Sequence, residues 1–155
     1  MDTVQRSRTA IARQRLSMPA RVAMSDAVVK TDTTVLDYGC GRGDDVGYLA
    51  ALGIAVQGWD PHFRPIPPPT RADVVLLTYV LNVIENIDER METLKAALGL
   101  ARRCLVVSVR LRWEEHSIQG LDHHDGVITT RGTFQALHRP EEFRLWANMI
   151  TGIVQ

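Results

Sequence analysis

The hydrophobic positions of the chain fall into short apolar runs separated by stretches with helical periodicity. The apolar runs are rich in β-branched residues and predict buried strands at residues 33–38, 55–59, 72–77 and 104–109. Strands that alternate with helices imply right-handed βαβ crossovers and a mostly parallel sheet. The pattern therefore predicts an α/β fold with three layers (αβα), in which helices cover both faces of the sheet.

Helix start and stop signals place the elements between the strands. After the first strand, Asp44 and Asp45 begin a helix that Gly53 ends. Asn86 and Glu89 have capping-box spacing and begin the clearest helix, which we expect to reach Ala101. Arg102 and Arg103 follow this helix, where their positive charge would complement the dipole at its C-terminus. The remaining expected elements are an amphipathic helix at 9–16, a helix from Ser17 to about Ala27, a helical turn at 79–84, an extended piece at 127–130 and a last helix from Pro140.

Composition indicates one ordinary globular domain. The chain has 155 residues, of which 45% are hydrophobic, and 18 basic residues balance 18 acidic ones. Disorder and coiled coil are excluded by these values. Cys40 and Cys104 are far apart and form no CxxC pair, and no apolar run is long enough to span a bilayer. We therefore expect a cytoplasmic protein that is not bound to a membrane.

Two further features of the chain are weak signals. Residues 1–30 hold six basic and two acidic groups, which is either an electrostatic footprint for nucleic acid or, as we favour, a solvated helix face. Four histidines lack the spacing of metal ligands: His116, His123, His124 and His138. The sequence predicts no metal site.

The glycine cluster after the first strand is the strongest candidate for a site. Gly39, Gly41 and Gly43 follow a strand directly, and ligands of parallel α/β sheets bind at the carboxyl ends of the strands. Asp60 ends the second strand, where a carboxylate can accept hydrogen bonds from ribose hydroxyls. Gly43 comes one position early for a dinucleotide motif and is followed by two aspartates, whereas Asp37 suits a cationic ligand.

Four segments give the chain a resemblance to a known family: VLDYGCGRGDD (35–45), GWDP (58–61), ADVVLLTYVLNVIE (72–85) and TTRGTFQAL (129–137). The chain resembles the class I S-adenosylmethionine-dependent methyltransferases, and among them the methyltransferases associated with DNA phosphorothioation systems. The resemblance implies an enzyme with a Rossmann-like fold, S-adenosyl-L-methionine as cofactor, and a single methyltransferase-like domain over 1–155. It divides that domain into N-terminal helices (1–30), a cofactor-binding core (31–110) and a substrate-side loop with a C-terminal helix (111–155).

The resemblance also implies roles for individual residues. Asp37 would lie near the methionine amino group, Gly39 and Gly41 beneath the cofactor, and Asp60 on the ribose. Completing this set, Cys40 and Gly43 belong to the same loop, Pro61 and His62 would lie near the adenine, Thr78 and Tyr79 would line the methyl-transfer side, and Asn82 follows one helical turn later. Tyr79 and Asn82 are the catalytic candidates, although tyrosine at a strand end is often only packed and asparagine often only caps a helix.

Other residues receive weaker assignments. Trp59 is expected in the core rather than on the adenine. The candidate proton acceptors are Glu114, His123, His124 and Asp125, all in the loop region after the fourth strand.

The chain departs from the family pattern in two places. Only residues 61–71 separate Asp60 from the strand at Ala72. This stretch is too short for the strand and flanking helices that the family has at this place. The contact to the adenine would therefore come from Arg64 or the proline segment. The closing antiparallel strands of the family are also expected to be missing.

Three functional hypotheses remain open. The first is a methyltransferase, with DNA or a DNA-modification protein as candidate partner. The second is a catalytically idle subunit that binds S-adenosylmethionine and acts through a protein partner. The third, which we favour least, is a nicotinamide-binding Rossmann domain. The sequence leaves the methyl acceptor and the oligomeric state undetermined.

Overall fold

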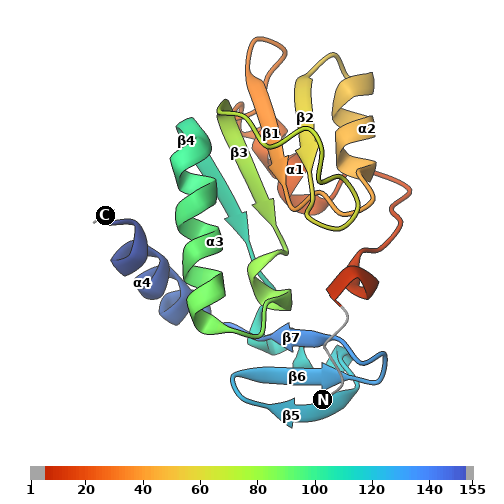
Figure 1. Ribbon diagram of the computed structural model, residues 1–155, viewed down its shortest axis with the longest axis vertical. Helices are drawn as coiled ribbons and strands as arrows, with labels where there is room; N and C mark the ends of the chain where they lie inside the picture. The colour runs from red at the N-terminus through yellow and green to blue at the C-terminus, as the bar shows by residue number, and fades with distance from the viewer. Residues whose placement is uncertain (1–5, 153–155) are drawn as a thin grey trace. The chain divides into compact units, whose positions relative to one another are not determined.

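A computed structural model describes residues 6–152 of the chain (Figure 1). The described residues divide into two compact units. Residues 10–78 and 97–108 make up one unit, here called the parallel-sheet unit. Residues 6–9, 79–96 and 109–152 make up the other, the antiparallel-sheet unit. The expectation of a single domain over 1–155 stays a prediction.

The parallel-sheet unit is built on four strands, β1 (Thr34–Tyr38), β2 (Ala55–Trp59), β3 (Ala72–Thr78) and β4 (Ala101–Ser108). Their order in the sheet is β2-β1-β3-β4, and every neighbouring pair is parallel (Figure 1). Two helices, α1 (Met18–Ser25) and α2 (Asp44–Ala51), belong to the same unit. After β2, which lies on one side of β1, the chain crosses back to β3 on the other side of β1. The strand order therefore reverses beside β1, which is where α/β sheets bind ligands.

Both faces of this sheet are buried. On one face, Val35, Val74 and Leu76 pack in a cluster with Ala20 of α1 and Leu49 of α2. The opposite side chains of the same strands, Leu36, Val75 and Leu77, have no exposed surface, and neither has Ala97 in the last turns of the third helix, α3 (Ile87–Leu100). Strands buried on both faces read as continuous apolar runs, which is why the sequence pattern identified them. The predicted α/β fold with a parallel sheet is confirmed.

The antiparallel-sheet unit holds a small sheet and the later helices. Strands β5 (Gly120–His123), β6 (Gly126–Thr129) and β7 (Phe134–Ala136) pair in antiparallel order β5-β6-β7. The helical elements of this unit are the 3-10 turns η1 (Arg6–Thr9), η2 (Leu81–Val83) and η3 (Arg112–Ser117), the greater part of α3, and α4 (Pro140–Thr151). β7 packs against η2.

The structure differs from the predicted elements in three places. Residues 10–16 form no helix, and only the preceding η1 is helical. α3 ends at Leu100, and Arg102 and Arg103 lie in β4 instead of complementing the helix dipole. The predicted loop after residue 110 contains η3, β5 and β7 as well as the expected extended piece. The reason in the last case is that these strands are three or four residues long, too short to show an alternating pattern.

The shortening of the fold is confirmed. Residues 60–71 form turns and a single bridge between Asp60 and Arg64 rather than a strand. The described antiparallel strands lie in their own sheet, and the four-stranded sheet contains parallel neighbours throughout. In the part of the chain that the structure describes, no helix combines the length and apolar character needed to cross a bilayer.

Candidate functional site

The glycine loop after β1 is held in a conformation that side chains disfavour. Gly39, Gly41 and Gly43 all have positive φ angles, of 86°, 55° and 84°, which only glycine adopts without cost. The N–H groups of Gly39 and Cys40 both donate to the carbonyl of Trp59, at 2.7 and 3.0 Å. The loop is therefore fastened to the end of β2, with its glycines toward the carboxyl edge of the sheet.

Asp60 connects this loop to the turn that follows β2. Its Oδ2 accepts a hydrogen bond from the N–H of Gly41 at 3.0 Å. Its Oδ1 accepts from the N–H groups of His62 and Phe63, both at 2.9 Å. A carboxylate has about four lone-pair sites. Three of those of Asp60 accept backbone N–H groups, so about one remains to accept a hydrogen bond from a ligand hydroxyl.

Asp37 is the unusual group of the site. Its side chain is 3% exposed, and its Oδ1 is buried without a hydrogen-bond partner among the described residues. Burial and then the neighbouring Asp45 carboxylate raise its pKa to about 7, against the partial opposition of Arg13. A buried carboxylate with an unused acceptor is costly unless a cation or donor reaches it. The arrangement could accept a positively charged group or a hydrogen-bond donor.

The start of α2 is occupied by the protein's own acidic side chains. Asp44 Oδ2 accepts from the backbone N–H of Arg13 at 2.6 Å, and Asp45 Oδ1 accepts from that of Ser17 at 2.8 Å. These contacts fix the segment before α1 onto the loop. They also place negative charge where a dinucleotide pyrophosphate would require a free helix N-terminus.

The cysteine of the loop is not a nucleophile. Burial, together with the charges of Asp37 and Asp60, raises the pKa of Cys40 to about 12, so its thiol stays protonated. Its sulfur instead packs against β2 at Gly58, where an added Cβ would lie 3.0 Å from the sulfur and 2.7 Å from Val46. Gly58 is thus a packing requirement of the site that the sequence reading did not single out, although an isolated glycine inside a strand is a signal of close approach.

The predicted cofactor residues fall into two sets. Eight of them lie together in the parallel-sheet unit around the glycine loop and the turn after β2: Asp37, Gly39, Cys40, Gly41, Gly43, Asp60, Pro61 and His62. Thr78 ends β3, the strand beside β1. Arg64, proposed for the adenine, lays its guanidinium against Gly43, where an added Cβ would lie 2.7 Å from it. Trp59 packs on Tyr38, with ring centroids 4.7 Å apart.

Tyr79 and Asn82 belong to the antiparallel-sheet unit. Tyr79 has a φ of 57°, which is strained for a bulky residue and recurs at functional positions. Asn82 is 1% exposed, and its Nδ2 donates to Gln135 Oε1 at 2.8 Å. Their catalytic roles stay predictions, and the structure gives Asn82 a structural partner.

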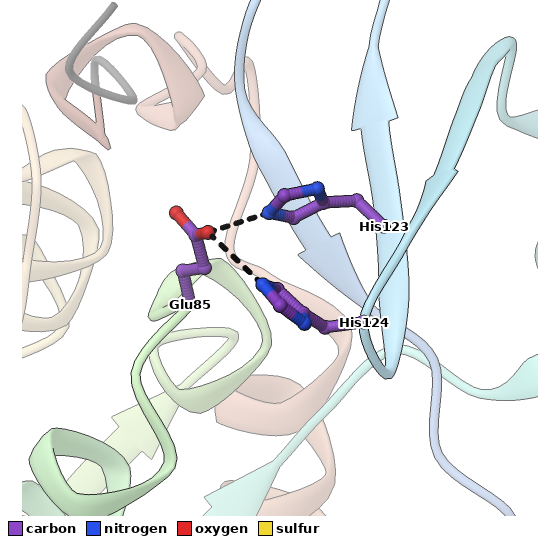
Figure 2. Close-up of side chains that lie close together, drawn as sticks. All are labelled: Glu85, His123 and His124. Carbon is purple, nitrogen blue, oxygen red and sulfur yellow. Dashed lines mark hydrogen bonds and ion pairs between the residues drawn. The ribbon is translucent and has the colours of Figure 1, made fainter. Parts of the chain in front are cut away.

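The candidate proton acceptors are each engaged by another group of the antiparallel-sheet unit. Glu114 accepts from the N–H of Leu111, and Asp125 is paired with Arg90. His123 Nε2 lies 2.6 Å from Glu85 Oε1, with His124 on the same carboxylate at 4.0 Å (Figure 2). The sequence reading missed this last cluster; its signal was the pair of consecutive histidines.

The comparisons with known proteins agree on the class of the chain. A methyltransferase domain family model matches residues 7–149. Among solved structures, the CcbJ methyltransferase from Streptomyces caelestis is similar with a TM-score of 0.59 and 18% identity, over 85% of this chain and 77% of that one. The 1,6-didemethyltoxoflavin-N1-methyltransferase of Burkholderia thailandensis, solved with its substrate and S-adenosylhomocysteine, gives a TM-score of 0.59 and 18% identity, over 84% of this chain and 65% of that one.

A search of curated proteins gives no significant match. The solved structures show the fold, and the family model covers nearly the whole chain. The expectation of an enzyme of the methyltransferase class with a shortened Rossmann-like fold is confirmed at this level. The chain belongs to the methyltransferase domain family.

Proposed function

We propose that this protein transfers a methyl group from S-adenosylmethionine to a nucleophilic acceptor. The observation that carries the proposal is the buried Asp37 carboxylate beside the glycine loop, of which one oxygen has no hydrogen-bond partner within residues 6–152. S-adenosylmethionine presents an ammonium and a sulfonium, so it can bring positive charge to this carboxylate, which the charge of Arg13 compensates only in part. The family of the chain and the S-adenosylhomocysteine bound to the Burkholderia enzyme support the same cofactor.

The residues around the loop would bind and orient this cofactor. Asp37 would face the methionine ammonium, and the glycines would allow the ligand to approach the backbone closely. Asp60, whose orientation is fixed by three backbone donors, would accept a ribose hydroxyl with its remaining lone pair. When bound, the cofactor supplies an electrophilic methyl group, and the protein's contribution is alignment and exclusion of water.

The acids at the start of α2 argue against the nicotinamide alternative. Asp44 and Asp45 accept backbone hydrogen bonds from Arg13 and Ser17. A pyrophosphate at this helix N-terminus would meet two carboxylates instead of free N–H groups. This supports an adenosyl ligand without phosphate.

Calorimetric titration with S-adenosylmethionine, S-adenosylhomocysteine and NAD tests the cofactor. We expect both adenosyl ligands to bind and NAD not to bind. Asp60→Asn should weaken binding by at least about tenfold, because the amide nitrogen cannot accept the Gly41 N–H and a charged hydrogen-bond acceptor is lost. Asp32→Asn is the matched control, since Asp32 is exposed and outside the loop. Preference for NAD, or equal binding by both variants, would contradict the proposal.

Transfer of labelled methyl groups distinguishes an enzyme from an idle subunit. Cofactor binding without transfer to DNA, RNA, protein or small molecules would favour the second hypothesis, a subunit that acts through a protein partner.

The finer assignment, a role in DNA modification linked to phosphorothioation, is proposed on the sequence resemblance. A cytoplasmic location is proposed on the two cysteines, which form no CxxC pair, and on the lack of a long apolar run. One arginine of the basic N-terminal segment, Arg6, is already in an ion pair with Glu89. Arg8 in the antiparallel-sheet unit and Arg15 and Arg21 in the parallel-sheet unit are exposed, so each could contact a phosphate.

Salt dependence of DNA binding tests this assignment. If three arginines contact phosphates, the slope of log K against log salt should be about −3, and replacing all three with Gln should abolish it. The matched control replaces three exposed arginines elsewhere, Arg103, Arg131 and Arg144. Absence of salt-dependent binding, or equal loss in the control, would leave the N-terminal arginines as a solvated face.

A further inference from the structure

Two consecutive histidines and a glutamate form a cluster that the proposed methyl transfer does not use. Glu85 follows η2, His123 ends β5, and His124 lies in the turn between β5 and β6. One ligand atom from each lies within 4.8 Å of the others. Figure 2 shows both imidazole rings turned toward the Glu85 carboxylate.

The backbone of the turn is what brings both rings to one side. Successive side chains of a strand point to opposite faces, so adjacent histidines would normally diverge. His124 has a φ of 53°, in the left-handed region that non-glycine residues seldom enter. This conformation interrupts the alternation. Such strained residues persist where the surroundings determine them, and they occur often at ligand sites.

Arg90 supplies those surroundings. Its side chain is 4% exposed, and its Nε donates to the carbonyl of Ile84 at 2.6 Å. Its Nη2 donates both to the carbonyl of Glu85 at 3.2 Å and to Asp125 Oδ1 at 2.9 Å. One guanidinium therefore fixes the backbone at Glu85 to the hairpin turn that carries His124.

Phe134 completes the support. It has no exposed surface, its ring lies 5.5 Å from the Arg90 guanidinium carbon, and the His123 ring packs edge-on against it at 6.3 Å. The three candidate ligands are thus held by buried groups, whereas their own side chains are 31% (Glu85), 38% (His123) and 70% (His124) exposed. The cluster therefore contacts buried groups on one side and is exposed to solvent on the other.

We propose that Glu85, His123 and His124 bind a divalent transition-metal ion such as Zn²⁺. Imidazole nitrogen and carboxylate oxygen are the ligands of such ions, whereas Mg²⁺ and Ca²⁺ prefer oxygen alone. Bond lengths near 2.0–2.1 Å place tetrahedral ligand atoms about 3.3 Å apart. The contact of 2.6 Å would open and that of 4.0 Å would close by about 0.7 Å each. The two histidine nitrogens, which lie within 4.8 Å of one another, would approach by at most about 1.5 Å.

Three protein ligands leave at least one coordination position for water or another molecule, the pattern of an open rather than a structural zinc site. The proposal is independent of cofactor binding, which involves other residues. Arg90 and Phe134 are positioning residues that act through the ligands.

The experiment is titration of the full-length, metal-free chain, without a histidine tag, with Zn²⁺ in a calorimeter and with Co²⁺ by absorption. We expect one Zn²⁺ per chain, a visible Co²⁺ spectrum that Zn²⁺ abolishes, and no comparable binding of Mg²⁺. His124→Asn should weaken Zn²⁺ binding by more than about 100-fold, since even outer-shell losses weaken metal binding by 10–100-fold. Asparagine tolerates a positive φ, so the turn should persist.

His124→Asn is decisive because the Glu85–His123 hydrogen bond does not need His124. Glu85→Gln should also abolish binding while retaining a hydrogen-bonding partner for His123. His116→Asn, at an exposed histidine of the same unit, is the matched control and should bind as the original chain does. Circular dichroism would verify that each variant is folded. No Zn²⁺ binding by the original chain, binding unchanged in His124→Asn, or equal binding of Mg²⁺ would overturn the proposal.

Discussion

Asp37→Asn should make the protein more stable at neutral pH and should impair its binding of S-adenosylmethionine. The pKa of Asp37 is raised from 3.8 to about 7, chiefly by burial. The folded state therefore binds a proton more tightly than the unfolded state does. The stability that this proton supplies is fully present below about pH 4 and is lost as the pH rises to about 7.

The expected size of the effect follows from the shift. One pKa unit corresponds to about 1.36 kcal/mol, so the ionised Asp37 destabilises the fold by on the order of 4 kcal/mol above pH 7. Asparagine cannot ionise and removes this term. The difference in the free energy of unfolding between Asp37→Asn and the original chain should grow from about pH 4 to about pH 7 and then level off. Denaturant unfolding across this range measures it.

Binding should change in the opposite direction. Removing one member of a buried charge pair weakens binding by about 2–5 kcal/mol, or at least about 30-fold. Asp45→Asn provides a graded comparison, because Asp45 raises the pKa of Asp37 and its loss should move the pH profile toward acid. Asp32→Asn should change neither stability nor binding. A destabilised Asp37→Asn, or one with full affinity, would contradict the role given to this carboxylate. Functional sites often lower the stability of the fold, as the ionised Asp37 is expected to do in the absence of its ligand.

The sequence predicted the parallel-sheet unit well because its signals are local. Apolar runs buried on both faces identify β1 and β3 directly, and the glycine loop with Asp37 and Asp60 was located from the residue types alone. What the sequence could not show was the electrostatic state of Asp37. That state depends on the burial of Asp37 and on the nearness of Asp45, which are properties of packing rather than of the motif.

The antiparallel-sheet unit was predicted poorly for a physical reason. Strands of three or four residues, such as β7, give no periodic signal, and β5 has a polar, exposed sequence. The sequence did not indicate the cluster of Glu85, His123 and His124, because these residues do not have the spacing of metal ligands along the chain. Glu85 is 38 residues from His123, and only the hairpin turn, Arg90 and the backbone at Glu85 bring these groups together.

Arg90→Leu should strongly destabilise the antiparallel-sheet unit. The buried guanidinium donates to the carbonyls of Ile84 and Glu85 and to both oxygens of Asp125. Leucine would leave two carbonyls and a carboxylate without this partner. Breaking a buried pair from one side destabilises by about 3–5 kcal/mol, and we expect the lower end because Asp125 is 39% exposed and water can replace part of the interaction.

The pH dependence identifies the interaction responsible. Hydrogen bonding to Arg90 holds the pKa of Asp125 below its ordinary value. The stability from this pair is therefore present above about pH 4 and is lost as the pH falls through the folded-state pKa. Arg90→Leu should lack this acid-side loss. Arg90→Lys keeps the charge without the planar fork and should recover only part of the stability.

Native-state hydrogen exchange is the suitable measurement, because a chain with two compact units need not unfold in one step. Arg90→Leu should lower protection in β5, β6 and β7 while leaving β1 and β3 protected. Lys95→Leu, at an exposed position of the same helix, should change protection by no more than about 0.5 kcal/mol. Equal protection in Arg90→Leu and Lys95→Leu would mean that the guanidinium does not hold the hairpin turn. It would then also remove the framework on which the proposed metal site depends.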